Sequence, residues 1–71
     1  MKARTYTAIV LYEDREELPL DLWTERGIQV KAFNPLSACE NAVMTVLVHP
    51  WPEKMIVYVL LGERNINVEG Q

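Results

Sequence analysis

NPLSACENAVMTVLVH, residues 34–49, is the stretch that decides the fold, because it has the clearest helical pattern in the chain. Asn34 suits the N-cap, since its side chain can accept a hydrogen bond from a free amide of the first turn, and Pro35 suits the first helical position. One side of the helix would carry the apolar residues Leu36, Cys39, Val43, Val46 and Leu47, with Ala42 beside them. We therefore predict one helix, about residues 35–48, whose single apolar stripe must be covered by a sheet.

Three other stretches have the composition of β-strands: residues 5–12 (TYTAIVLY), 27–33 (GIQVKAF) and 55–61 (MIVYVLL). Alternation divides the first into Tyr6, Ala8, Val10 and Tyr12 on one face and Thr5, Thr7, Ile9 and Leu11 on the other. In the second it places Ile28, Val30 and Ala32 inward. The third is apolar on both faces, which is typical of a central strand covered on both sides or of a strand buried in an oligomer.

These elements predict a single α+β domain over residues 1–71, with a three- to four-stranded antiparallel or mixed sheet and the helix packed on one face. Residues 65–68 (NINV) are the candidate fourth strand. Residues 18–23 (LPLDLW) contain Pro19, which disfavours a central strand, and their alternating leucines fit an edge strand or a short turn of helix. We expect an irregular edge segment there.

Composition restricts the function classes. A chain of 71 residues has room for one small core, which disfavours a self-contained enzyme with a deep cleft. Dimerisation would compensate for that small core, so we expect a homodimer. The net charge of −3 disfavours phosphate-rich partners and suits a protein partner, especially a basic one. Neither a signal-peptide pattern nor a run long enough to span a membrane is present, so we expect a cytoplasmic protein.

Catalytic and metal-binding residues are sparse. Cys39 and His49 are the only candidate pair of nucleophile and base, and they stand about 15 Å apart along one straight helix. One Cys with one His is too few ligands for a metal site. We therefore expect a protein that is not an enzyme and that uses no cofactor and no metal.

Binding to another protein fits the residues better. The acidic run EDREE, residues 13–17, is either a solvated turn or a docking site for a basic partner. Met44 and Val48 lie off the predicted core stripe of the helix, and both tryptophans stand in irregular segments, where an indole can anchor an interface or close the end of the core. The predicted partner-binding residues are Glu13, Asp14, Glu16, Glu17, Trp23, Met44, Val48 and Trp51.

The alternative is a single-stranded nucleic-acid-binding module that stacks bases on aromatic residues of an open sheet face. Its candidate residues are Tyr6, Tyr12, Phe33 and Tyr58, and it requires that they share the uncovered face.

Along the chain, TYTAIVLYEDRE is followed by a loop and then by GIQVKAFNPLSACENAVMTVL. This order resembles the N-terminal domain of HicB-like antitoxins. That family runs a strand into a capped helix of the type T-L-E-E-A-L-E-N-A. The matching positions here are Asn34, Leu36, Ala38, Glu40, Asn41 and Ala42. The family's P-D-L-P-G-C segment is echoed by residues 18–22 without its glycine and cysteine. In size, acidity and lack of motifs the chain is also similar to small phage-encoded inhibitor proteins. Both resemblances imply a regulator that blocks a partner sterically or by acidic mimicry.

Overall fold

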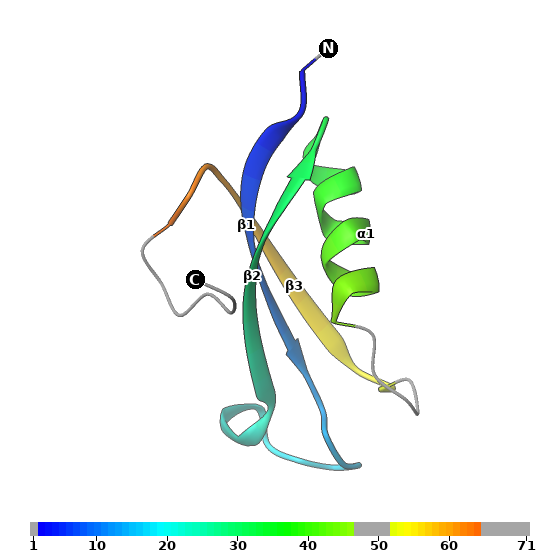
Figure 1. Cartoon of the computed structure of the whole chain (residues 1–71). Helices are drawn as coiled ribbons and strands as arrows, with labels where there is room; N and C mark the ends of the chain where they lie inside the picture. Colours follow the sequence, from blue (N-terminus) through cyan, green and yellow to red (C-terminus); the bar gives the residue numbers. More distant parts are fainter. Residues whose placement is uncertain (1, 47–51, 65–71) are drawn as a thin grey trace.

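The computed structural model describes residues 2–46 and 52–64. It contains one three-stranded antiparallel sheet in the order β2-β1-β3, with one helix across one face (Figure 1). The elements are β1 (Arg4–Tyr12), a 3-10 helix (Leu20–Leu22), β2 (Thr24–Ala32), α1 (Pro35–Thr45) and β3 (Met55–Leu61). The predicted α+β fold is confirmed, whereas the candidate strand at residues 65–68 lies outside the described residues.

β1 is the centre of the fold, because it pairs with β2 on one side and with β3 on the other. Its alternation is the predicted one: Tyr6, Ala8, Val10 and Tyr12 are all buried on the face that α1 covers. Ile28 and Ala32 of β2 are buried on the same face. The core is therefore a single layer between the sheet and α1.

α1 begins as predicted, with the Asn34 side chain accepting a 2.8 Å hydrogen bond from the backbone N–H of Ser37. The predicted core stripe is right at Val46 and Ala42 and wrong at Leu36. Leu36 is 69% exposed, and the residues that face the sheet with no exposed surface are Ala38, Ala42 and Val46. Ala38 and Ala42 are small, and Ala8 on β1 is also fully buried, so α1 can pack close against the sheet. Cys39 and Val43 flank the line and are half-buried, and Leu47 lies outside the described residues.

Among the described residues β3 is an edge strand, so the central position that its sequence allowed is not the one it takes there, and its burial in an oligomer stays a prediction. Its residues are all apolar, yet none of the seven is buried. β2 also differs from the prediction, because it begins at Thr24, three residues before Gly27. The added residues pair with the end of β1, where Tyr12 stands opposite Thr24.

The chain turns back over the sheet after β3. Gly62 has a φ of 90°, which favours glycine, and its N–H donates a 2.8 Å hydrogen bond to the Thr5 carbonyl. The Thr7 hydroxyl donates to the Gly62 carbonyl at 2.8 Å and accepts from the Arg64 N–H at 3.0 Å. These bonds hold residues 62–64 against the face of β1 opposite the helix. In the described part of the chain, no helix is long and apolar enough to cross a membrane.

The orientation of α1 can be tested with two truncations, one at its C-cap and one in its first turn. Val46→Ala removes fully buried methyl groups and should lower the free energy of unfolding by about 2 kcal/mol. Leu36→Ala, the matched control at an exposed position, should change it by less than about 0.5 kcal/mol. Urea denaturation followed by circular dichroism measures both, and a larger loss for Leu36→Ala would contradict this orientation.

Candidate functional site

The connection between β1 and β2, residues 13–23, forms one end of the molecule, which we call the hairpin tip (Figure 1). The 3-10 helix closes it with two backbone hydrogen bonds, from the N–H of Leu22 to the Pro19 carbonyl at 2.9 Å and from that of Trp23 to the Leu20 carbonyl at 3.2 Å. The indole N–H of Trp23 adds a third, to the Leu18 carbonyl at 3.0 Å. These bonds give the tip a defined shape.

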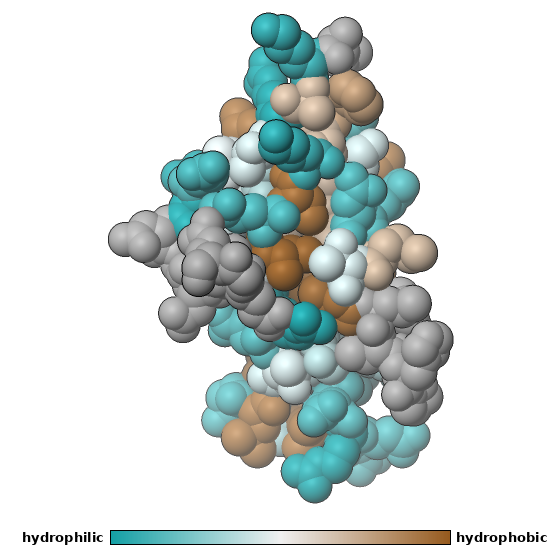
Figure 2. All heavy atoms as spheres, in the orientation of Figure 1, coloured by the Kyte–Doolittle hydropathy of each residue, from teal (hydrophilic) through white to brown (hydrophobic). Residues whose placement is uncertain are grey.

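Two large apolar side chains project from this tip. Leu20 is 58% exposed and Leu22 is 61% exposed, and no residue of the 3-10 helix is buried. Figure 2 shows apolar atoms at this end of the molecule, next to strongly hydrophilic ones. The sequence predicts an irregular edge segment here and does not single out these two leucines. Their exposure could have been predicted from their neighbours, because Leu20 and Leu22 flank Asp21 and follow Pro19. A proline and a carboxylate in so short a run favour a surface turn.

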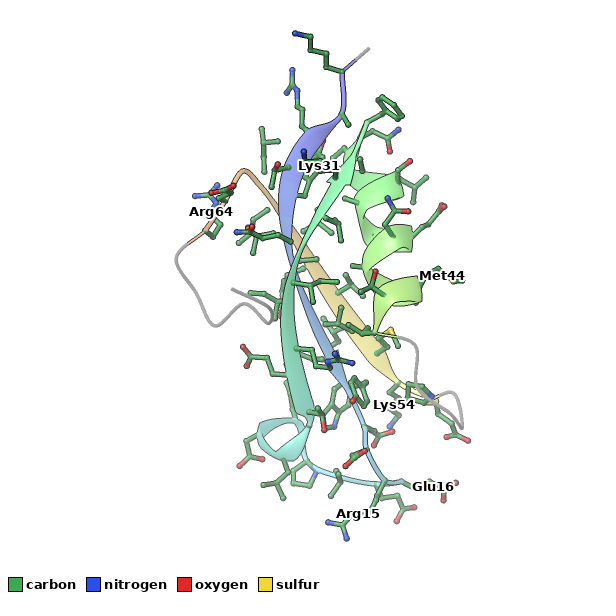
Figure 3. The ribbon with its side chains drawn as sticks, viewed as in Figure 1. Arg15, Glu16, Lys31, Met44, Lys54 and Arg64 are labelled. Carbon is green, nitrogen blue, oxygen red and sulfur yellow. The ribbon has the colours of Figure 1, made fainter. Side chains whose placement is uncertain are left out.

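The tip is also the acidic end of the molecule. It holds five of the ten Asp and Glu residues and one arginine, a net charge of −4, so the rest of the chain carries +1. Asp14, Glu16 and Glu17 are exposed, as both the solvated-turn and the docking-site interpretations of EDREE require. At the other end of the sheet, Arg4 and Lys31 are exposed on β1 and β2, and Figure 3 shows Glu16 and Lys31 at opposite ends.

Glu13 is the exception among the predicted acidic contacts. Only 7% of its surface is exposed, so it is not available for a partner, and that prediction is wrong. The reason is backbone pairing: the Glu13 N–H donates a 3.3 Å hydrogen bond to the Lys54 carbonyl, which continues the pairing of β1 with β3 beyond the ends of both strands. Glu13 therefore belongs to the base of the tip.

The other predicted partner-binding residues do not form one surface. Trp23 is half-buried at the base of the tip, where its N–H is already bonded to Leu18. Met44 is 67% exposed, as predicted, but it lies on α1, away from Glu16 (Figure 3). Val48 and Trp51 lie outside the described residues. The structure thus brings together the acidic loop and Trp23, and adds Leu20 and Leu22 to them.

The aromatic residues of the nucleic-acid alternative are separated. Tyr6 and Tyr12 are buried beneath α1, whereas Tyr58 pairs with Ile9 on the opposite face of the sheet. Phe33 is exposed beyond the end of β2. The aromatic platform that this alternative requires is therefore not formed.

Among residues 2–46 and 52–64, no group of three or more His, Cys, Asp and Glu side chains is arranged to hold a metal ion. Cys39 is a free, half-buried thiol on α1, and His49 lies outside the described residues. No protein-family model, curated protein or solved structure matches this chain.

Backbone strain within the tip gives one testable prediction. Glu17 has a φ of 60°, and it is the only described residue other than glycine with a positive φ. Glu17→Gly should raise the free energy of unfolding by about 0.5–1 kcal/mol, because glycine adopts this conformation without a steric penalty. Glu16→Gly makes the same change of charge at the neighbouring position and should lower stability. Equal effects of the two variants in thermal unfolding would contradict the strained geometry.

The hydrogen bond from the Trp23 indole N–H to the Leu18 carbonyl gives a second testable prediction. Trp23→Phe keeps an aromatic ring but removes the indole donor, so we expect a loss of about 1 kcal/mol in stability. We also expect faster hydrogen exchange of the tip amides. Leu22→Ala, at an exposed position of the same 3-10 helix, is the control and should change stability by less than about 0.5 kcal/mol. Unchanged exchange in Trp23→Phe would show that the indole does not hold the tip.

Proposed function

We propose that this protein is a small non-enzymatic regulator that binds another protein through its hairpin tip. The observation that carries the proposal is the exposure of Leu20 and Leu22 on a loop whose net charge is −4. Interfaces commonly combine an apolar centre with a polar rim, and charges at the rim accelerate association with a partner of opposite charge. The partner we expect is a basic protein with an apolar recess.

The shape of the molecule suits blockade of a partner. The protein is 41 Å long, and the tip lies at one end of the long sheet, so the tip can enter a basic recess while the sheet and α1 stay outside. Its exposed carboxylates would take the place of an acidic ligand, and the rest of the domain would obstruct the entrance. The resemblance to HicB-like antitoxins supports the same class of function, because an antitoxin acts by binding a protein.

The proposal is tested by capturing partners from the cells that express this protein. The tagged wild-type protein is compared with the double variant Leu20→Ser, Leu22→Ser and with the control Met44→Ser, which alters an apolar side chain exposed elsewhere. We expect one protein to be retained by the wild type and by the control and lost from the double variant. Retention by the double variant, or no specific protein in any sample, would overturn the proposal.

The role of charge is measured by the affinity between this protein and the purified partner that the capture experiment identifies. We expect Asp14→Lys, Glu16→Lys, Glu17→Lys to weaken binding at least about tenfold at low salt, and less at 1 M salt, where the screening length falls to about 3 Å. Glu40→Lys, Glu53→Lys, Glu63→Lys is the matched control, because it changes the net charge equally at exposed positions outside the tip. Equal weakening by both triple variants would exclude a specific role for the tip.

A further inference from the structure

β3 (Met55–Leu61) has the most apolar sequence of the three strands and the least burial. All seven side chains are uncharged and apolar or aromatic, none is buried, and the exposed ones are Tyr58, Leu60 and Leu61. By contrast, five of the nine residues of β1 are buried. Apolar surface gathered on one strand in this way is typical of a surface that another chain covers.

The backbone of β3 also presents unpaired groups. Along β3, every second residue directs its backbone N–H and C=O groups toward β1. Two hydrogen bonds at the ends of the strand show which residues these are: one from the Glu13 N–H to the Lys54 carbonyl and one from the Gly62 N–H to the Thr5 carbonyl. It follows that Ile56, Tyr58 and Leu60 direct their N–H and C=O groups toward β1. Met55, Val57, Val59 and Leu61 therefore direct theirs to the outer edge, where no strand of the described residues pairs with them.

This edge lacks the features that usually prevent association. β3 contains no charged residue, no proline and no interruption of its register with β1. The described chain that follows it does not cover the edge, because Gly62 and Arg64 are bonded to Thr7 and turn toward β1. The other edge strand, β2, carries exposed Glu25 and Lys31, which disfavour pairing with a further strand.

We propose that a second copy of this chain pairs with β3 in the antiparallel direction, with Tyr58 facing Tyr58 across a two-fold axis. This register matches all seven residues of both strands, and it places Val57 opposite Val59 and Met55 opposite Leu61. The residues that face each other in those pairs are the ones whose backbone groups point outward, so each can donate and accept a hydrogen bond. The product is a six-stranded sheet with both helices on one face.

The side chains of the two copies are complementary in this register. On the face without helices, Ile56 lies opposite Leu60 of the second copy, which extends the apolar surface formed with Ile9 and Leu11. On the helix face, the exposed Leu61 is covered by Met55 of the second copy. No charged side chain falls within the paired strands, and Gly62 turns the chain away before Glu63 is held opposite Glu53.

The composition of the two edges favours a closed dimer over a fibre. Once the two β3 strands are paired, the remaining edges are both β2, with their exposed charges. A foreign strand could use the same backbone groups, but the uncharged sequence of β3 matches itself across all seven residues. The proposal does not involve the hairpin tip, so it stands or falls separately from the proposed function.

Disulfide trapping tests the register. In a Cys39→Ala background, which removes the native thiol, Tyr58→Cys should form a covalent dimer on mild oxidation. The Cα atoms of directly opposed residues at a non-hydrogen-bonded site are about 4.5 Å apart, within the range that a disulfide spans. Leu60→Cys is the control, because its neighbour in the second copy is Ile56 rather than itself. Cross-linking of the control but not of Tyr58→Cys would overturn this register.

Measurements of solution mass test whether two copies associate through the β3 edge. Light scattering and sedimentation over a range of concentrations should give a dimer for the wild type and for Met44→Lys. Tyr58→Lys, which sets two positive charges opposite each other at an exposed position, should give a folded monomer by circular dichroism. A wild-type protein that stays monomeric at every concentration, or a Tyr58→Lys variant that stays dimeric, would overturn the proposal.

Discussion

The close contact between α1 and the sheet determines most of this structure. Ala8 on the strand and Ala38 and Ala42 on the helix have no exposed surface, and side chains of that size let the two backbones approach closely. The larger Tyr6 and Tyr12 then fill the two ends of the same face. Because one helix of eleven residues supplies the second layer in the described part of the chain, it covers only one face of the sheet. In the described part of the chain, residues 62–64 pack on the opposite face over Thr7, the outer edge of β3 pairs with no strand, and the hairpin tip keeps Leu20 and Leu22 exposed.

The sequence predicted the elements of this fold better than their packing. The bounds of β3 and the cap at Asn34 were right, because a run without Gly or Pro and an Asn-Pro pair are local signals. The rotation of α1 was wrong at Leu36, because hydropathy ranks leucine above alanine whereas a close contact selects the smaller side chain. The sequence also could not predict that β3 lies at an edge of the described sheet. A strand that is apolar on both faces is compatible with more than one position in a sheet.

The candidate site was predictable only in part. The exposed acids of EDREE were recognisable from their charge alone, but the burial of Glu13 depends on where the pairing of β1 with β3 ends, which is a property of two distant segments. The exposure of Leu20 and Leu22 was not predicted, because alternating leucines fit an edge strand as well as a short turn of helix, and the 3-10 turn exposes both. The resemblance to HicB-like antitoxins and the expected partner remain predictions.

The hydrogen bonds that close β3 onto β1 also have a consequence for biosynthesis. The Thr7 hydroxyl bonds to groups 55 and 57 residues further along the chain, whereas β1 and β2 are joined by a short connection. The first hairpin can form early, but its central strand lacks one neighbour until residue 62 has left the ribosome. Contacts this distant in sequence slow folding, because a long loop must close before any of them is made. Until then the nascent chain exposes one edge of β1, a site at which a chaperone can intervene.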